Sequence, residues 1–163
     1  MLRLTLVRHA KTAPAHDGQE DWDRELEAKG WHEAKTMAQR LKDRELSPDF
    51  VITSPAVRAR STTKIIAERL KIRRECIVED EQLYLASPEV MLSVIKAQGG
   101  KHDHVLVVGH NPGITEFADR LSKDRPIDNM PTCAVFTLEF DVKSWTEVEW
   151  RSGVNAEFDY PRR

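Results

Sequence analysis

The chain has 163 residues, of which 40% are hydrophobic and 32% charged, a composition that predicts one globular domain and excludes a disordered protein. The formal net charge of −2 supplies no general basic field, so we expect neither nucleic acid nor an anionic membrane as a partner. No apolar run reaches the roughly 18 residues of a membrane span. The N-terminal stretch MLRLTLVRHA is charged too soon for a signal peptide, and the two cysteines show no CxxC spacing, so we predict a cytoplasmic protein with free thiols.

Six apolar or alternating segments predict β-strands, and segments with helical periodicity separate most of them. The strands are expected at residues 4–9, 49–54, 76–80, 104–110, 134–140 and 146–152. Residues 105–108, VLVV, are apolar at every position, as is typical of a strand covered on both faces. No helix separates the last two strands, which predicts an antiparallel hairpin. This order predicts an α/β fold, a three-layer α/β/α sandwich around a mainly parallel mixed sheet of about six strands.

Apolar residues repeat on one face in four segments, as expected for helices that pack against the sheet. The segments are residues 31–41 after Gly30, residues 59–70, residues 91–95 and residues 114–121. Three of the helices share a start signal, because Ser54, Ser87 and Asn111 each precede a proline. Serine and asparagine cap a free N–H group and proline tolerates the first helical position, so we expect helices to begin at these prolines.

Chemically versatile side chains follow three of the predicted strands. Arg8 and His9 end the first strand, Arg58 follows the second, and His110 ends the strand at 104–110. In open α/β sheets, ligands bind at the carboxyl ends of the strands, where helix N-termini favour an anion. Arginine matches phosphate oxygens with a planar fork, and a neutral imidazole can attack phosphorus. We therefore expect two arginines and two histidines to surround one phosphoryl group, while Arg60 points outward.

Five motifs, taken in order along the chain, resemble the histidine phosphatase superfamily, which is also called phosphoglycerate mutase-like. They are RHAK, DWDRELEAKG, SPAVRARST, LYLAS and GHNPG, and the resemblance extends from Leu4 to about Phe140. The ordered set looks like the SixA-type phosphohistidine phosphatase branch. The resemblance implies a phosphoglycerate mutase-like fold, one histidine phosphatase domain over residues 1–163, and catalysis that needs no metal or other cofactor.

The resemblance also implies a role for each motif residue. His9 would be the nucleophile that becomes phosphorylated, and Arg8 beside it would hold the phosphate. Arg58 would be the second phosphate clamp, and His110 would contact phosphate oxygens and stabilise the transferring group. Asn111 would border the pocket as a further substrate contact, or it would cap the helix that follows it.

Two positions depart from the family pattern. The superfamily usually has glycine after the Arg-His pair, where this chain has Ala10, so we expect a modest adjustment of the backbone. Many relatives carry a glutamate general acid shortly before the third helix, where this chain reads EDEQLYLASPE. The carboxylates that could replace it are Glu79, Asp80 and Glu81 in that stretch, and Asp17, Asp21 and Asp23 in the loop after the first strand.

The missing acid indicates the substrate class. An alkoxide that leaves a phosphomonoester gains from protonation, whereas phosphohistidine can release a neutral imidazole. We therefore expect a metal-independent phosphatase that hydrolyses phosphohistidine on a protein through a phosphorylated His9. A phosphatase for small phosphomonoesters and a non-catalytic phosphate-binding module are the alternatives.

Further features bear on the partner and on cofactors. The connections at residues 11–26 and 71–88 are short and leave a shallow site, which suits a side chain displayed on another protein. The chain contains no P-loop or GxGxxG motif, so no nucleotide cofactor is expected. His102 and His104 are interpreted as solvated turn residues rather than metal ligands, because no third ligand is near them in the sequence.

Overall fold

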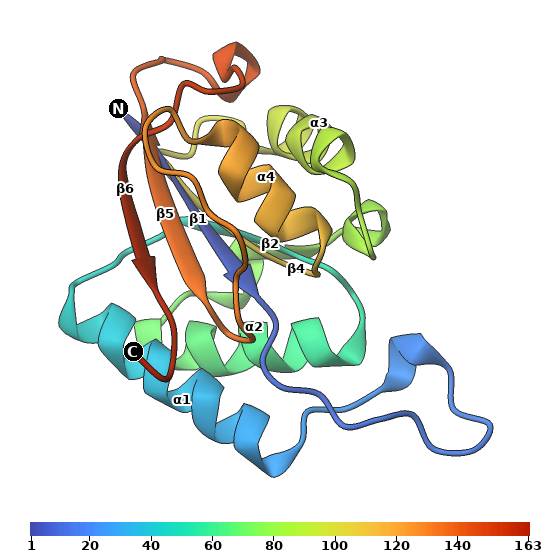
Figure 1. Ribbon diagram of the computed structural model, residues 1–163. Helices are drawn as coiled ribbons and strands as arrows, with labels where there is room; N and C mark the ends of the chain where they lie inside the picture. Colours follow the sequence, from blue (N-terminus) through green and yellow to red (C-terminus); the bar gives the residue numbers. More distant parts are fainter.

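The computed structural model describes all of residues 1–163 and is built around one six-stranded sheet (Figure 1). The strands are β1 (Leu2–Arg8), β2 (Phe50–Thr53), β3 (Ile77–Glu79), β4 (His104–Gly109), β5 (Val135–Phe140) and β6 (Val154–Asp159), in the order β3-β2-β4-β1-β5-β6. Strands β3, β2, β4 and β1 run parallel, whereas β5 pairs antiparallel with β1 and β6 antiparallel with β5. The predicted mixed, mainly parallel sheet is therefore confirmed.

Four helices complete the three predicted layers. Helices α1 (Ala28–Asp43) and α2 (Val57–Leu70) cover one face of the sheet, and α3 (Pro88–Gln98) and α4 (Gly113–Leu121) cover the other (Figure 1). Short 3₁₀ helices lie at η1 (Asp21–Asp23), η2 (Arg74–Cys76), η3 (Glu81–Leu83) and η4 (Trp145–Glu147). None of the helices has both the length and the apolar character needed to cross a lipid bilayer.

Strand β4 shows why both faces of the sheet are covered. Val105 and Val107 pack into the core with α3 and α4, while Leu106 and Val108 pack into the core with α1 and α2. All four residues are at most 1% exposed, as their unbroken apolar run predicted. Among the residues predicted on buried helical faces, Trp31 is an exception, because it is 42% exposed at the edge of α1.

The predicted strand at residues 146–152 is wrong, and the last strand is β6 further along the chain. Residues 145–147 form η4 instead, and Trp145 and Val148 are buried against the main core. The Trp145 indole N–H also donates to the backbone oxygen of His102 at 2.7 Å. Two buried residues three positions apart fit a turn, and the alternating pattern of the sequence concealed this spacing.

The three Ser/Asn-Pro start signals have different outcomes. Ser87 caps α3 as predicted, because its hydroxyl accepts from the backbone N–H of Val90 and Pro88 is the first helical residue. The signals at Ser54 and Asn111 are wrong by one to two residues, since α2 begins at Val57 and α4 at Gly113 without a side-chain cap. In both cases the polar side chain accepts no hydrogen bond from a backbone N–H group inside the helix. Both cysteines are free, with Cys133 buried and Cys76 half-buried.

Candidate active site

The carboxyl ends of three parallel strands bring His9, His110 and Ser54 to one edge of the sheet. The last residue of β1 lies opposite the last residue of β4, and β2 ends beside them. The ring centroids of His9 and His110 are 5.2 Å apart, with an angle of 58° between the ring planes. His9 is 9% exposed and His110 is 3% exposed, so the structure brings two buried imidazoles together.

One ring nitrogen of His9 is held by the loop that follows it. His9 Nδ1 lies 2.9 Å from the backbone oxygen of Ala10 and 3.2 Å from the hydroxyl oxygen of Thr12. The Thr12 hydroxyl donates its own hydrogen to the same carbonyl at 3.0 Å, so Nδ1 is the donor in both contacts. His9 therefore carries its hydrogen on Nδ1 and keeps the lone pair on Nε2, the arrangement that nucleophilic attack requires.

Both histidines are neutral at physiological pH because they are buried. Burial lowers the pKa of His9 to about 4, and the positive charges of Arg58 and Arg8 act in the same direction, against a hydrogen bond to Ala10. Burial likewise lowers the pKa of His110 to about 3, with further contributions from His9 and Arg58. The site therefore keeps two uncharged imidazoles beside two guanidinium groups.

Two nitrogens at this edge lack a partner inside the protein. One guanidinium nitrogen of Arg8, Nη1, donates to the backbone oxygen of Met130 at 2.9 Å, but its Nε is buried without a hydrogen bond. His110 Nε2 lies 2.7 Å from the hydroxyl oxygen of Ser54, whereas its Nδ1 is buried without a hydrogen bond. Buried polar groups almost always have a partner, so this pair indicates a place for a polar ligand.

Arg58 is held in place from the loop after β1. It lies in the first turn of α2 and is 3% exposed. Its Nη1 donates to the backbone oxygen of Asp21 at 2.7 Å, and its Nη2 donates to the Asp21 carboxylate at 2.9 Å. A guanidinium has five N–H groups, so these two bonds fix its plane and leave donors for a further acceptor.

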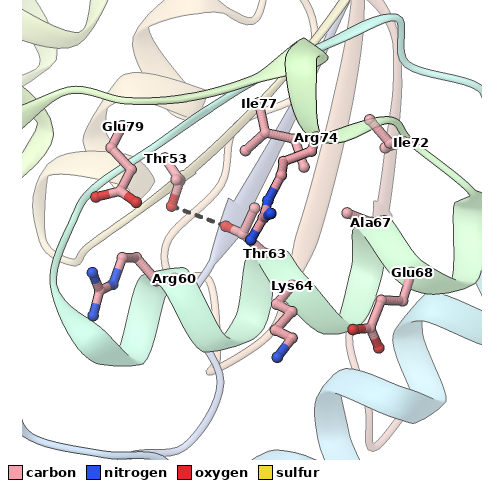
Figure 2. A pocket seen from close by; sticks show the side chains of 10 residues that line it. All are labelled: Thr53, Arg60, Thr63, Lys64, Ala67, Glu68, Ile72, Arg74, Ile77 and Glu79. Carbon is pink, nitrogen blue, oxygen red and sulfur yellow. Dashed lines mark hydrogen bonds between the residues drawn. The ribbon is translucent and has the colours of Figure 1, made fainter.

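Arg60 does not share this environment, although it lies only two residues further along α2. It is exposed and lines a separate groove of about 490 Å³ between α2 and β3 (Figure 2). The groove also holds Lys64, Arg74 and the acidic residues Glu68 and Glu79. The expectation that Arg60 points away from the histidines is consistent with this position.

Asp21 forms a bridge between Arg58 and an aromatic pair. The Tyr84 hydroxyl donates to the Asp21 carboxylate, and the Tyr84 ring meets the His110 ring edge-on at 5.5 Å. Trp22 in turn contacts Tyr84, with ring centroids 4.8 Å apart. The bond from Tyr84, with others from Arg24 and Arg58, holds the pKa of Asp21 well below its usual range. Asp21 is therefore ionised at neutral pH and holds no proton for a leaving group.

The other carboxylates considered as acids lie in different surroundings. Glu79 lines the groove of Figure 2, and Asp80 accepts from the backbone N–H of Gln82 and from the Gln98 side chain. Exposed positions are occupied by Asp17, Asp23 and Glu81. Tyr84 is the residue of the EDEQLYLASPE stretch that contacts a histidine of the site.

The Asn111 side chain forms hydrogen bonds that stabilise the edge of the site. Both hydrogens of its amide are engaged, one by the side-chain oxygen of Asn129 and one by the backbone oxygen of Met130. Its oxygen accepts from the Thr115 hydroxyl at 2.6 Å. Since the Met130 oxygen also accepts from Arg8, Asn111 supports the segment that positions Arg8. The expectation that Asn111 caps α4 is wrong for the same reason, because its side chain is used here.

The histidines of the KHDH stretch are placed differently from the expectation. His104 is not a solvated turn residue, since it begins β4, is 7% exposed and lies 2.7 Å from the Thr5 hydroxyl. His102 stacks on Phe50 with ring centroids 4.4 Å apart. No group of three or more histidine, cysteine, aspartate or glutamate side chains is arranged to hold a metal ion.

Four residues at the site gained no firm role from the sequence, namely Thr12, Ser54, Arg24 and Tyr84. Thr12 could have been recognised as a neighbour of His9 three residues along the same loop. Tyr84 occupies the stretch where many relatives place a glutamate. The contact between Ser54 and His110 joins residues 56 positions apart, and no local pattern announces it.

Comparison with known proteins agrees with this geometry. The family model of the histidine phosphatase superfamily (branch 1) matches residues 4–83. A relative from Mycobacterium tuberculosis without a characterised function is 30% identical over 165 residues, which cover 96% of this chain and all of the relative. A solved structure described as the "putative phosphohistidine phosphatase SixA from Agrobacterium tumefaciens" is 30% identical, with a TM-score of 0.80 over 96% of this chain and 97% of that chain.

More distant structures share the fold alone. The mycobacterial glucosyl-3-phosphoglycerate phosphatase is 17% identical, with a TM-score of 0.67 over 98% of both chains.

The chain belongs to the histidine phosphatase superfamily. Within the superfamily it is of the SixA type. This membership supports a phosphatase, a hydrolase whose substrate is phosphorylated.

Proposed function

We propose that this phosphatase hydrolyses phosphohistidine on another protein, with His9 as the nucleophile. The observation that carries the proposal is the fixed tautomer of His9, which leaves a lone pair on a buried, neutral Nε2. The partnerless nitrogens of Arg8 and His110 support an anion beside it. The similarity to the Agrobacterium structure supports a phosphohistidine substrate.

In the first step, the Nε2 lone pair of His9 attacks the phosphorus of the substrate. The new N–P bond forms as the N–P bond to the substrate imidazole breaks, and that imidazole leaves neutral because its other nitrogen already carries a hydrogen. His9 keeps its own hydrogen on Nδ1, shared between Ala10 and Thr12. Transfer between two imidazoles therefore needs no general acid.

In the second step, water attacks the phosphorus of phospho-His9. The Nε2–P bond breaks, its electron pair returns to Nε2, and both water hydrogens leave with dihydrogen phosphate. Arg8, Arg58 and His110 would donate to the phosphoryl oxygens in both steps. Most of the catalysis is then positioning and charge neutralisation by fixed donors, as is usual in phosphoryl transfer.

The charges at the edge of the site favour the hydrolysis of N–P bonds over that of O–P bonds. An alkoxide leaving group needs a proton, and general acid catalysis typically contributes about 10²–10⁴-fold. Asp21 is the carboxylate nearest to the arginine clamp, but its hydrogen bonds keep it ionised. A phosphomonoester would lose this contribution, whereas phosphohistidine would not.

The test compares two substrates on one enzyme. We expect kcat/KM for a protein phosphorylated on histidine to exceed that for a phosphoserine peptide by at least about 10²-fold, the contribution of the absent acid. His9→Ala should abolish the hydrolysis of both, measured as release of inorganic phosphate. The Arg60→Ala variant serves as the control, since Arg60 lies in the separate groove.

Three results would contradict the proposal. Equal kcat/KM for the two substrates would favour a phosphatase for small phosphomonoesters. A wild-type protein that binds a phosphorylated substrate but releases no inorganic phosphate would favour a non-catalytic phosphate-binding module. Equal turnover by wild type and His9→Ala would exclude His9 as the nucleophile.

A further inference from the structure

Ser54 lies where the second imidazole of the site is held. It follows β2 directly, and its backbone N–H donates to Val108 of β4 at 3.1 Å, just before His110. Its hydroxyl oxygen lies 2.7 Å from His110 Nε2. Ser54 has no exposed surface and His110 is 3% exposed, so water does not compete for this contact.

The surroundings of the Ser54 hydroxyl decide which atom donates. The backbone N–H of Ala56 donates to the Ser54 oxygen at 3.3 Å, so the hydroxyl already accepts one hydrogen bond. The other polar atom bonded to this hydroxyl is His110 Nε2. A hydroxyl has one hydrogen to give, and Nε2 is the acceptor within its reach.

The opposite direction leaves more groups unsatisfied. If Nε2 carried the hydrogen, the Ser54 hydroxyl would lack an acceptor and the lone pair of His110 Nδ1 would lack a donor. With the hydrogen on Nδ1, a single donor is left over, and a phosphoryl oxygen would satisfy it. Burial holds the pKa of His110 at about 3, so the ring does not gain a second hydrogen at neutral pH.

We propose that Ser54 is a positioning residue, whose hydroxyl fixes His110 in the tautomer with hydrogen on Nδ1 and so presents that N–H to a phosphoryl oxygen. The inference rests on the proposed function for its catalytic consequence, but not for the tautomer itself. The two histidines then carry hydrogen on the same ring nitrogen, Nδ1, but use their two nitrogens in opposite ways. His9 uses Nδ1–H to anchor its ring and Nε2 to attack, while His110 uses Nε2 to anchor its ring and Nδ1–H to bind.

The experiment reads the tautomer and the affinity for inorganic phosphate separately. The ring ¹⁵N shifts of His110 at neutral pH, assigned with a His110→Gln variant, should show hydrogen on Nδ1 in the wild type. Ser54→Ala should shift the ring toward hydrogen on Nε2 and weaken inorganic phosphate binding by about tenfold, the usual effect of one lost hydrogen bond. Ser54→Thr, which keeps the hydroxyl, should restore both readouts.

The matched control is Ser87→Ala, which alters another serine that precedes a proline. Ser87 caps α3 and does not contact His110, so its loss should lower stability without changing the tautomer or phosphate affinity. If Ser54→Ala fails to fold, Ser54→Cys takes its place, because a thiol is a weak donor of similar size.

Hydrogen on Nε2 of His110 in the wild type would overturn the proposal. So would a Ser54→Ala protein that keeps hydrogen on Nδ1 and binds inorganic phosphate within twofold of the wild type. Neither readout needs turnover. A wild type that fails to hydrolyse phosphohistidine, yet shows the predicted tautomer and affinities, would sink the proposed function and leave the role of Ser54 standing.

Discussion

Two regions that share helix α2 differ in how they hold their charges. At the strand ends, Arg58 is 3% exposed and is fixed by two hydrogen bonds to Asp21. In the groove between α2 and β3, Arg60 is exposed and lies with Lys64 and Glu68 among side chains of both signs (Figure 2). The groove encloses about 490 Å³, but no histidine lines it.

The difference teaches that neither a cavity nor positive charge is sufficient to define this site. Water screens the attraction between an exposed guanidinium and an anion, and ordering the side chain costs conformational entropy. A buried guanidinium that is already oriented attracts a bound anion more strongly. The strand ends supply that burial, and the groove does not. Variants of the two arginines therefore test the comparison most strongly.

The largest effect is expected from Arg58→Ala. Loss of a buried, charge-assisted donor should lower kcat/KM for phosphohistidine by about 10²–10³-fold, the range for one transition-state donor. For Arg60→Ala, kcat/KM should stay within about twofold of the wild type, because Arg60 is exposed and lines the separate groove. Steady-state kinetics on both variants, with circular dichroism as a check on folding, would measure this. A loss of tenfold or less for Arg58→Ala would place it outside the site.

The pH profile should separate the buried site from ordinary histidine chemistry. Attack requires neutral His9, whose pKa burial lowers to about 4, so kcat/KM should hold constant from neutral pH down to about pH 5 and fall below it. For a histidine with the usual pKa of about 6.5, only about one molecule in 30 would still be neutral at pH 5. Initial rates, corrected for spontaneous hydrolysis of the acid-labile substrate, test this. A midpoint near pH 6.5 would contradict the burial of His9.

The smallest effect concerns the backbone behind the nucleophile. A Cβ placed on Gly30 of α1 would lie 2.0 Å from the backbone oxygen of Lys11, so the helix and the loop after His9 cannot both keep their places. Gly30→Ala should lower the free energy of unfolding by about 1–3 kcal/mol through overpacking. Lys64→Ala in the groove should change it by at most about 0.5 kcal/mol.

Urea unfolding of both variants measures the difference. Alanine is the better helix former by about 1 kcal/mol where space allows, so a stabilised Gly30→Ala protein would show that the close approach is absent.

The fold was predictable from the sequence where one face of each element is apolar. The run VLVV in β4 and the apolar faces of the four helices each needed only local periodicity. The prediction of a strand at residues 146–152 failed because Trp145 and Val148 are buried against the main core, which is built from distant parts of the chain. An alternating pattern alone cannot show this. The starts of α2 and α4 were misplaced because the Ser54 and Asn111 side chains do not cap a backbone N–H group inside these helices and also bond to distant residues, His110 and Met130.

The site was predictable only in part, for a related reason. Arg8, His9, Arg58 and His110 stand at strand ends or in the helix turn that follows, so a parallel sheet is enough to bring them together. Their ring orientations and donors depend on contacts such as Ser54 with His110 and Asp21 with Arg58, which join distant parts of the chain. Geometry of that kind appears only when the chain is folded.

The most direct test of the whole account is a rapid quench of the enzyme during turnover of a protein carrying ³²P-phosphohistidine. The account predicts an acid-labile, base-stable label on the enzyme, located at Nε2 of His9 and absent from His9→Ala. Steady release of phosphate with no label on the enzyme, or a label on His110 instead, would contradict it.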